Sequence, residues 1–226
     1  MKKLPREFYL SDDTLRIARE LLGKTLVVPD AVATGERVSG MIVETEAYLG
    51  AIDKAAHSYG SRRTARTETM YAAGGTVYIF FIYGMYFQFN VVAGAIDTPH
   101  AILIRAVEPV EGVEIMRERR RAKSKNPDAK LSDANLTSGP GKLCIALGID
   151  KTFNNEDLLG ERVWIVGPQR IVRINMLAVG DPPFAAVVDR TDVENGDGTL
   201  LLQPCAQRRN VDGWYIGCLR HCRCLH

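Results

Sequence analysis

The fold of this chain is decided by residues 77–93, which read VYIFFIYGMYFQFNVVA. Together with the residues up to 96, this apolar run is long enough to raise the question of a membrane-spanning helix. Its aromatic and β-branched content is typical of strands, and a Tyr-Gly pair interrupts it. We therefore predict no membrane helix but two antiparallel strands, near residues 76–82 and 85–93, joined by a tight turn with Tyr83 at its tip.

The segments around this hairpin alternate between strand and helix patterns, and no internal repeat is visible. Ser11, Asp12 and Asp13 are suited to cap an amphipathic helix that ends at Gly23. The other elements that the pattern predicts are strands at residues 24–28, 38–48 and 101–107 and helices at residues 109–123 and 137–147. Strands interleaved irregularly with helices indicate an α+β fold. We expect a single compact domain with a mostly antiparallel curved sheet, flanking helices and a protruding β-hairpin.

The composition is that of a globular protein with a sizeable core. The 226 residues are 46% hydrophobic and have a formal net charge of +2, which neither requires nor excludes a polyanionic partner. Lys2, Lys3 and Arg6 interrupt the first residues, so no secretory signal is expected. Cys144 is the only Cys before residue 200, which is typical of a reducing compartment. We expect an intracellular protein, in the cytoplasm or nucleoid if the source is bacterial.

The carboxyl-terminal end has an unusual composition. Its Cys and His side chains are Cys205, Cys218, His221, Cys222, Cys224 and His226. Their spacing lacks the paired CxxC units of a zinc site, so we predict neither a metal nor another cofactor. A diverged tail or a shifted reading frame would both produce such a run. We divide the chain into a domain over residues 1–189 and an atypical tail over residues 190–226, for which we expect poor order.

Residues 43–48 place two carboxylates on one face of a predicted strand. Side chains alternate in a strand, so Glu44, Glu46 and Tyr48 point the same way. A solvated strand edge would give the same alternation. The apolar residues that lead into this segment favour instead a position near a buried boundary, where a carboxylate needs a partner or a raised pKa.

Two basic clusters and an exposed aromatic residue indicate a nucleic-acid partner. Residues 61–66 contain three Arg, and residues 116–125 contain six cations and one anion. A solvated face is the alternative for each cluster. Tyr83 at the hairpin tip is placed to wedge into a DNA stack and hold it bent, unless it folds back onto the core.

Further candidate site residues stand out in and near the predicted strands. Tyr48, His57 and Phe80 could form a flat-walled slot in which a base stacks on aromatic faces. Ordinary core packing would equally explain Phe80, and a structural role would explain His57. Arg105 is conspicuous because it lies in the apolar run 102–107.

Several motifs in this order resemble the alkyladenine (3-methyladenine, or alkylpurine) DNA glycosylase family. They are VETEAYLG at 43–50, AAHS at 55–58, GTVY at 75–78, IYGMYF at 82–87 followed by Asn90, IRAVEP at 104–109 and SGPGKL at 138–143. The resemblance covers residues 4–166. It implies a compact α+β fold and the excision of alkylated purines from duplex DNA by base flipping, a step of base excision repair.

The resemblance also implies catalytic roles. Glu46 is the general base that activates the water attacking the deoxyribose C1′ atom, Arg105 helps to hold that water, and Glu44 is a supporting carboxylate. Such an arrangement suits base excision, because a carboxylate stabilises an oxocarbenium-like state while it orients the nucleophile. An alkylated purine already carries positive charge, so it leaves without much acid assistance.

Contacts to the DNA follow from the same resemblance. Tyr48, His57 and Phe80 stack on the flipped base, and Tyr83 fills the gap that it leaves. Asn90 disfavours guanine by crowding its exocyclic amino group, although a buried hydrogen-bonding role would also explain an Asn in an aromatic strand. The residues that we expect at the DNA backbone are Arg62, Arg63, Arg66, Tyr78, Ser138, Gly139 and Lys142. For residues 138–142, whose amides open a helix, a plain helix cap is the alternative.

The sequence departs from the family pattern at three places. Phe80 stands where many relatives have Tyr, which keeps the ring and loses a hydroxyl. Thr67 and Glu68 stand where an Asn and a cation are usual. After residue 169 the closing Pro-Trp-Arg-Phe-type strand is missing, and the segment 181–184 is a poor substitute.

The expected protein is therefore a monomeric, monofunctional glycosylase whose partner is double-stranded DNA containing damaged purines. A catalytically weak protein that binds distorted DNA, made so by its diverged tail, is the second hypothesis. A third is lyase activity through a Schiff base on Lys54, for which a solvated position on a loop is the alternative.

Overall fold

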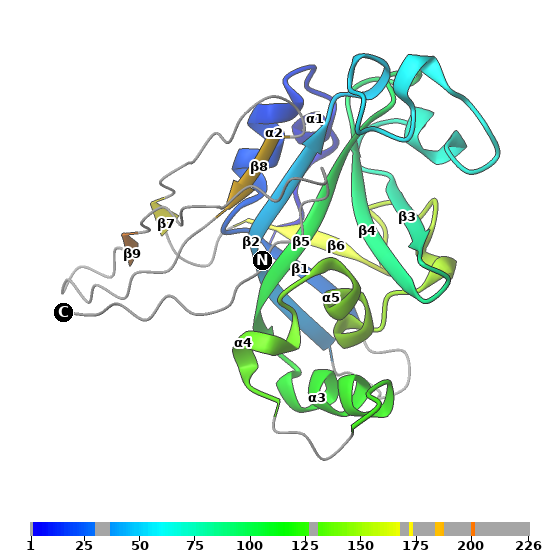
Figure 1. The fold of residues 1–226 in the computed structure, drawn as a ribbon. Coiled ribbons are helices and arrows are strands. Elements are labelled where there is room, and N and C mark those ends of the chain that lie inside the picture. Colours follow the sequence, from blue (N-terminus) through cyan, green and yellow to red (C-terminus); the bar gives the residue numbers. More distant parts are fainter. Residues whose placement is uncertain are drawn as a thin grey trace, which may run out of the picture.

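The computed structural model describes residues 2–29, 37–126 and 131–167, together with the backbone of three short strands further along the chain (Figure 1). An open sheet with strand order β3-β4-β5-β2-β1-β6 is its centre, and each neighbouring pair is antiparallel. These strands are β1 (Thr25–Pro29), β2 (Arg37–Tyr48), β3 (Val77–Ile82), β4 (Tyr86–Ala93), β5 (His100–Glu111) and β6 (Trp164–Val166). Helices flank the sheet, so the predicted α+β fold is confirmed.

Two helices precede the first strand, and the other helices and the 3-10 turns lie in the connections between strands. Those in the described part of the chain are α1 (Arg6–Tyr9), α2 (Thr14–Leu21), α3 (Val113–Ala122), α4 (Asp133–Leu136) and α5 (Pro140–Leu147), with 3-10 turns at Gly50–Ile52, Tyr59–Ser61, Glu68–Tyr71 and Lys151–Phe153. As predicted, Asp13 caps α2, because its carboxylate accepts a hydrogen bond of 2.9 Å from the amide of Arg16.

The helix predicted at residues 109–123 starts later than expected. Pro109 pairs with Gly40 and Glu111 pairs with Ser39, so residues 109–111 extend β5 and the helix begins at Val113. The local pattern misplaced this boundary because a distant strand, β2, supplies the hydrogen-bonding partner that keeps these residues extended.

The core lies between the sheet and two helices that pack on it. Ile17 and Leu21 of α2 and Leu143 of α5 are fully buried against strand residues such as Phe89 and Ile104. α2 packs on β2, whereas α5 packs on β4 and β5. This burial supplies the apolar contacts that hold both helices to the sheet.

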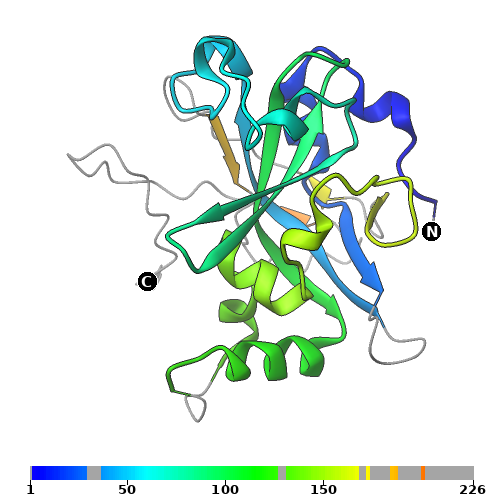
Figure 2. The ribbon, with the colours of Figure 1, turned by 90° about the vertical axis from the view of Figure 1, so that its right-hand side faces the viewer.

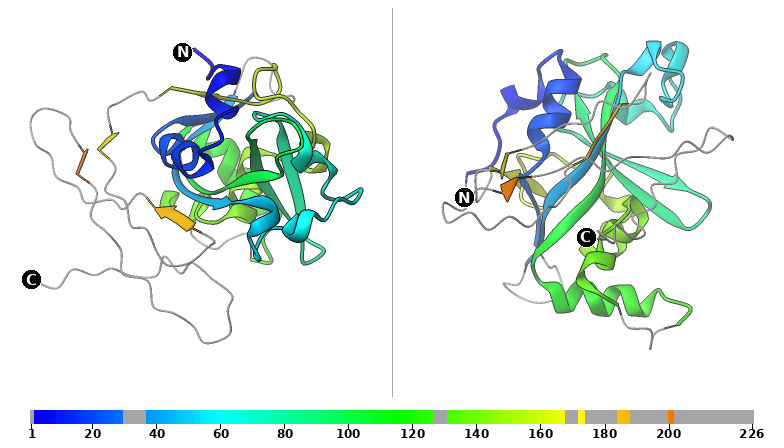
Figure 3. Two further views of the ribbon diagram at one scale, coloured as in Figure 1. Left: turned by 90° about the horizontal axis from the view of Figure 1, so that it is seen from above. Right: turned by 60° about the vertical axis from the view of Figure 1, so that its left-hand side comes forward.

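The predicted hairpin is formed by β3 and β4 at one edge of the sheet, and its turn extends beyond the other strands near α5 (Figure 2). Its turn contains Tyr83 and Gly84, both with positive φ (54° and 67°). The two views in Figure 3 show residues 50–71, drawn in cyan, and this hairpin on the side of the molecule away from α1 and α2. In the described part of the chain, no helix has the length and hydropathy that crossing a bilayer requires.

β2 has partners on both edges, and its pairing is irregular in the middle. β5 follows one edge, while β1 pairs with residues 37–41 and β8 (Phe184–Val187) pairs with residues 44–47 on the other. The β2–β5 register shifts on either side of Glu44. Such irregularities bend a strand and change where its side chains point, and they are frequent next to active sites.

Two further short strands lie in the carboxyl-terminal part of the chain. β7 (Val172–Arg173) and β9 (Leu200–Leu201) form a separate parallel pair. Apart from β9, the predicted tail at residues 190–226, with its Cys and His cluster, lies outside the described residues.

We expect Gly74→Ala to destabilise the fold. A Cβ atom at this position would overlap the main-chain oxygen of Tyr9 and lie 2.9 Å from that of Gly94, so backbone rather than a flexible side chain would have to move. The expected loss is about 1 to 3 kcal/mol in the free energy of unfolding, measured by denaturant titration. Gly167→Ala is the control, because its Cβ would meet no heavy atom of the described residues within 4 Å. Equal stability of the two variants would contradict this packing.

Candidate active site

Arg105 of β5 holds the two carboxylates of β2. Its Nε donates a hydrogen bond of 3.0 Å to Oε1 of Glu44, and its Nη1 donates one of 2.6 Å to Oε1 of Glu46. Glu46 is only 7% exposed. The solvated strand edge considered above is therefore wrong, because these carboxylates lie largely out of water and share a cation, as buried charges require.

The second oxygen of Glu46 has a partner of its own. The hydroxyl of Tyr48, two residues along the same strand, donates a hydrogen bond of 2.7 Å to Oε2. Each oxygen of the Glu46 carboxylate thus has a donor of its own, and the two hydrogen bonds fix the orientation of the carboxylate plane. An ionised carboxylate has about four lone-pair positions, so a water molecule can still donate a proton to it.

The charges of this cluster follow from burial and mutual contact. Burial raises the pKa of Glu44, and Arg105 opposes that rise. Burial and then the charge of Glu46 raise the pKa of the Tyr48 hydroxyl, so Tyr48 keeps its proton and remains the donor. Burial alone would lower the pKa of Arg105, but Glu46 and Glu44 more than offset it and raise the pKa. With both carboxylates ionised, the cluster has a net charge of −1.

His57 and Phe80 form one aromatic wall. Their ring centroids are 3.7 Å apart, and the planes differ by 22°. No base can enter between two rings in contact, so the predicted slot does not have His57 and Phe80 as facing walls. Because Arg66 also lies over Phe80, a base that stacks here uses the outer face of His57, with Tyr48 as the remaining candidate for the facing wall.

The Arg66 guanidinium lies over Phe80 and affects His57. Its Cζ atom is 4.1 Å from the Phe80 ring centroid, and its Nη2 donates a hydrogen bond of 3.0 Å to the main-chain oxygen of Phe81. Burial, followed by the positive charge of Arg66, lowers the pKa of His57 to about 4. His57 is consequently neutral near pH 7.

Tyr78 and Asn90 are buried beside this wall. Tyr78 is 2% exposed, and its hydroxyl lies 3.1 Å from Nδ1 of His57, so it orients His57 and is not placed at the surface for the DNA-backbone contact that the sequence predicted. The Nδ2 atom of Asn90 donates to the main-chain oxygens of Tyr78 and Gln88 at 3.1 and 3.2 Å. The buried hydrogen-bonding role is thus present, and exclusion of guanine stays a prediction.

Tyr83 does not fold back onto the core. Its side chain is 74% exposed at the tip of the hairpin. Phe81 and Met85 beside it are exposed as well, so the tip presents an apolar surface that the sequence reasoning, which named Tyr83 alone, missed. Phe81 lies near the end of β3 and Met85 lies in the turn, so their closeness to the predicted hairpin tip is the signal that could have found them.

Apart from Tyr78, the residues predicted at the DNA backbone fall into two groups. Arg62, Arg63 and Arg66 lie in the segment after His57, where only Arg62 has an exposed side chain without a hydrogen bond or ion pair among the described residues. Ser138, Gly139 and Lys142 lie at the start of α5.

The segment before α5 is joined to the strand that bears Arg105. Ser138 forms a β-bridge with Ala106, the residue after Arg105. Gly139 is the N-cap of α5 and makes no side-chain cap, while Nζ of Lys142 donates to Oγ of Ser138 at 3.3 Å. The backbone of this segment therefore lies next to the acidic cluster.

Asp53 is a site residue that sequence reasoning missed. It is almost fully buried, and its carboxylate accepts hydrogen bonds from the amides of Leu49 (3.1 Å) and Ala55 (2.9 Å). These bonds hold the loop that runs from Tyr48 to His57. An Asp that bonds an amide two residues later is a recognised turn signal, which could have identified it.

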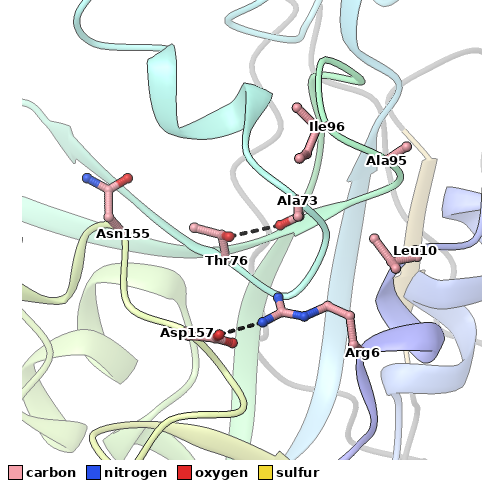
Figure 4. A pocket seen from close by; sticks show the side chains of 8 residues that line it. All are labelled: Arg6, Leu10, Ala73, Thr76, Ala95, Ile96, Asn155 and Asp157. Carbon is pink, nitrogen blue, oxygen red and sulfur yellow. Dashed lines mark hydrogen bonds and ion pairs between the residues drawn. The ribbon is translucent and has the colours of Figure 1, made fainter.

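A pocket of about 740 Å³ lies elsewhere on the surface (Figure 4). It is lined by Arg6 of α1 and by residues of nearby loops, including Thr76, Ile96 and Asp157, and by none of the predicted site residues. The chemistry of the acidic cluster, and not this hollow, identifies the candidate site. Among the described residues, no group of three or more His, Cys, Asp or Glu side chains is placed to hold a metal ion.

Comparison with known proteins gives consistent matches. A family model described as methylpurine-DNA glycosylase (MPG) matches residues 7–180. A protein of Desulfitobacterium hafniense (strain Y51) is 53% identical over 165 residues, which cover 73% of this chain and 79% of the relative. Proteins of Clostridium novyi (strain NT) and Clostridium acetobutylicum are 49% and 52% identical over 166 and 163 residues, covering 74% and 72% of this chain and 80% and 78% of the relatives. All three bear the name "Putative 3-methyladenine DNA glycosylase".

We expect His57 to titrate well below the ordinary His value of about 6.5. Because its folded-state pKa is lowered, the unfolded chain binds more protons between pH 6.5 and 4, so this group removes stability as the pH falls through that range. NMR titration of the His57 ring measures the midpoint. Arg66→Met should raise it, since one of the two causes of the lowering is removed. A wild-type midpoint near 6.5 would refute the description of this wall.

Proposed function

The chain belongs to the methylpurine-DNA glycosylase family, and from this premise we propose that it excises alkylated purines, 3-methyladenine among them, from duplex DNA. As a DNA glycosylase it is a hydrolase that acts on N-glycosidic bonds. We also propose that the damaged base is flipped out of the duplex, that no lyase step occurs and that individual residues have the roles argued below.

The observation that carries the proposal is the fixed carboxylate of Glu46. Arg105 and the Tyr48 hydroxyl each hold one of its oxygens, and it is nearly buried. A carboxylate in this position can accept a proton from water and direct the resulting nucleophile at the deoxyribose C1′ atom. Glu46 is therefore the proposed general base, and Arg105 helps to hold the water.

Charge supports the same assignment. Excision passes through an oxocarbenium-like state with positive charge on the sugar. Two carboxylates around one guanidinium leave a negative cluster at the site, and such preorganised charge stabilises the developing cation. Glu44 contributes to this by sharing Arg105, which makes it the supporting carboxylate.

The aromatic wall is the proposed base-binding surface. A purine flipped out of the duplex would stack between Tyr48 and the wall of His57 and Phe80, which is worth about 1 to 3 kcal/mol per stacked base. Extrusion is easiest for damaged or weakly paired nucleotides. Because His57 is neutral near pH 7, it does not repel a purine made cationic by alkylation.

The surface around the site suits duplex DNA. The exposed Tyr83 is the proposed wedge that fills the gap left by the flipped nucleotide. Arg62 and the segment from Ser138 to Lys142 are the proposed contacts to the phosphate backbone. We propose a monomer whose glycosylase domain spans residues 1–189, acting inside the cell where the chromosome is.

The test is a single-turnover excision assay with enzyme in excess over duplexes that contain 3-methyladenine, 7-methylguanine, hypoxanthine or ethenoadenine. Release of an alkylated base supports the proposal, and the relative rates rank the lesions. Binding of damaged DNA without release of any base, even with enzyme in excess, would refute it in favour of a protein that only binds distorted DNA.

Glu46→Gln should abolish excision of 3-methyladenine while damaged DNA is still bound, because the amide cannot take the proton from water. Loss of a general base lowers the rate by roughly 10²- to 10⁴-fold. Glu20→Gln is the matched control: Glu20 lies on α2 in an exposed ion pair with Arg16, so the rate should not change. An undiminished excision rate for Glu46→Gln would contradict the role of Glu46 as general base.

A monofunctional glycosylase should form no covalent intermediate with DNA. The side chain of Lys54 is exposed on the loop after Tyr48, which favours a solvated amine over a Schiff base. Incubation with lesion-containing duplex and borohydride should therefore trap no protein–DNA adduct. A trapped adduct that disappears in Lys54→Met would establish the lyase alternative.

A further inference from the structure

The three arginines that follow His57 have different surroundings. Arg62 is exposed and has no ion pair among the described residues, and Arg66 lies over Phe80. Arg63 makes a two-pronged contact with Glu68: its Nε donates to Oε2 at 3.0 Å and its Nη2 donates to Oε1 at 2.7 Å. Its remaining terminal nitrogen, Nη1, donates to Oδ1 of Asp97 at 2.6 Å.

These contacts connect two segments that are far apart in the sequence. Glu68 is in the segment after His57, whereas Asp97 is in the loop between β4 and β5. The Arg63 guanidinium also lies 4.5 Å over the ring of the buried Tyr71, and the amide of Asp97 donates to the main-chain oxygen of Tyr71 at 2.9 Å. Side-chain and main-chain contacts thus join the same two segments.

The connected segment supports the aromatic wall. Arg66 follows Arg63 by three residues, covers Phe80 and is bonded to the main-chain oxygen of Phe81. Phe80 in turn stacks on His57. A displacement of the segment that contains Arg63 would therefore move Arg66 and release one side of the wall.

We propose that Arg63 is a positioning residue, which ties the segment of residues 62–71 to the loop before β5 and so holds the base-binding wall, and that Arg62 supplies the phosphate contact. This proposal rests on the proposed glycosylase function. It separates two residues that the sequence placed together at the DNA backbone.

The charges around Arg63 favour this division of roles. Two carboxylates face one guanidinium, so the group of three is negative and does not attract a phosphate. The contacts raise the pKa of Arg63 and lower that of Glu68, so both stay ionised. Isolated exposed ion pairs contribute little to stability. Ion pairs contribute more when, as for Arg63, the guanidinium makes a two-pronged contact with one carboxylate and also contacts a second carboxylate and an aromatic ring.

Salt dependence separates a phosphate contact from an internal one. Each phosphate contact contributes about 0.9 to the slope of log K against log salt concentration for duplex DNA. For undamaged duplex we expect Arg62→Gln to reduce the slope by about 0.9 and Arg63→Gln to leave it unchanged. We also expect Arg63→Gln to lower the single-turnover excision rate at saturating enzyme at least about tenfold, because the wall is misplaced.

Two further variants make the test independent of folding defects in Arg63→Gln. Arg63→Lys keeps the positive charge but cannot make the two-pronged contact with Glu68. It should therefore excise as poorly as Arg63→Gln while binding DNA with the wild-type slope. Glu68→Gln should also lower excision without raising the slope. Arg16→Gln, which removes another exposed, ion-paired arginine, is the control and should match wild type in both measurements.

Three results would overturn the proposal. They are a slope reduced by about 0.9 in Arg63→Gln, wild-type excision in Arg63→Lys, and tighter binding with a slope increased by about 0.9 in Glu68→Gln, as expected if Glu68 withholds Arg63 from a phosphate. If wild type excises no lesion, the proposed function fails. The slopes on undamaged DNA then decide by themselves whether Arg63 contacts phosphate.

Discussion

One buried guanidinium organises the centre of this molecule. Arg105 donates to a carboxylate at Glu44 and to another at Glu46, and it opposes the rise in the pKa of Glu44 that burial causes. The arrangement requires β2 and β5, the longest strands of the sheet, to lie side by side. The catalytic proposal therefore depends on strand pairing as much as on residue type.

Three structural features restrain the segments around this cluster. The register of β2 shifts around Glu44, Asp53 holds the loop between Tyr48 and His57, and Ser138 bridges to the residue after Arg105. Each feature acts on a different segment near the carboxylates: β2 itself, the loop after Tyr48 and the segment before α5. Catalytic groups need such restraint, because small displacements from a productive geometry cost large factors in rate.

The basic segment shows why residue type alone does not define a role. Arg62, Arg63 and Arg66 look equivalent in sequence, and each could face a phosphate. In the structure, Arg63 is occupied by Glu68 and Asp97, and Arg66 lies on Phe80. An arginine whose N–H groups already bond carboxylates would have to give up those bonds to bind a phosphate, so the partners decide the function.

Sequence alone determined the features that depend on local spacing. Alternating side chains placed Glu44, Glu46 and Tyr48 on one face, and the aromatic run with its Tyr-Gly turn predicted the hairpin, because the period of a strand is a property of consecutive residues. Only the tertiary structure decided which partners these residues meet. The contact of His57 with Phe80, the burial of Tyr78, the extension of β5 through Pro109 and the ion pair of Arg63 with Asp97 all depend on segments distant in the chain. Local pattern cannot specify such partners, because packing and strand register bring them together.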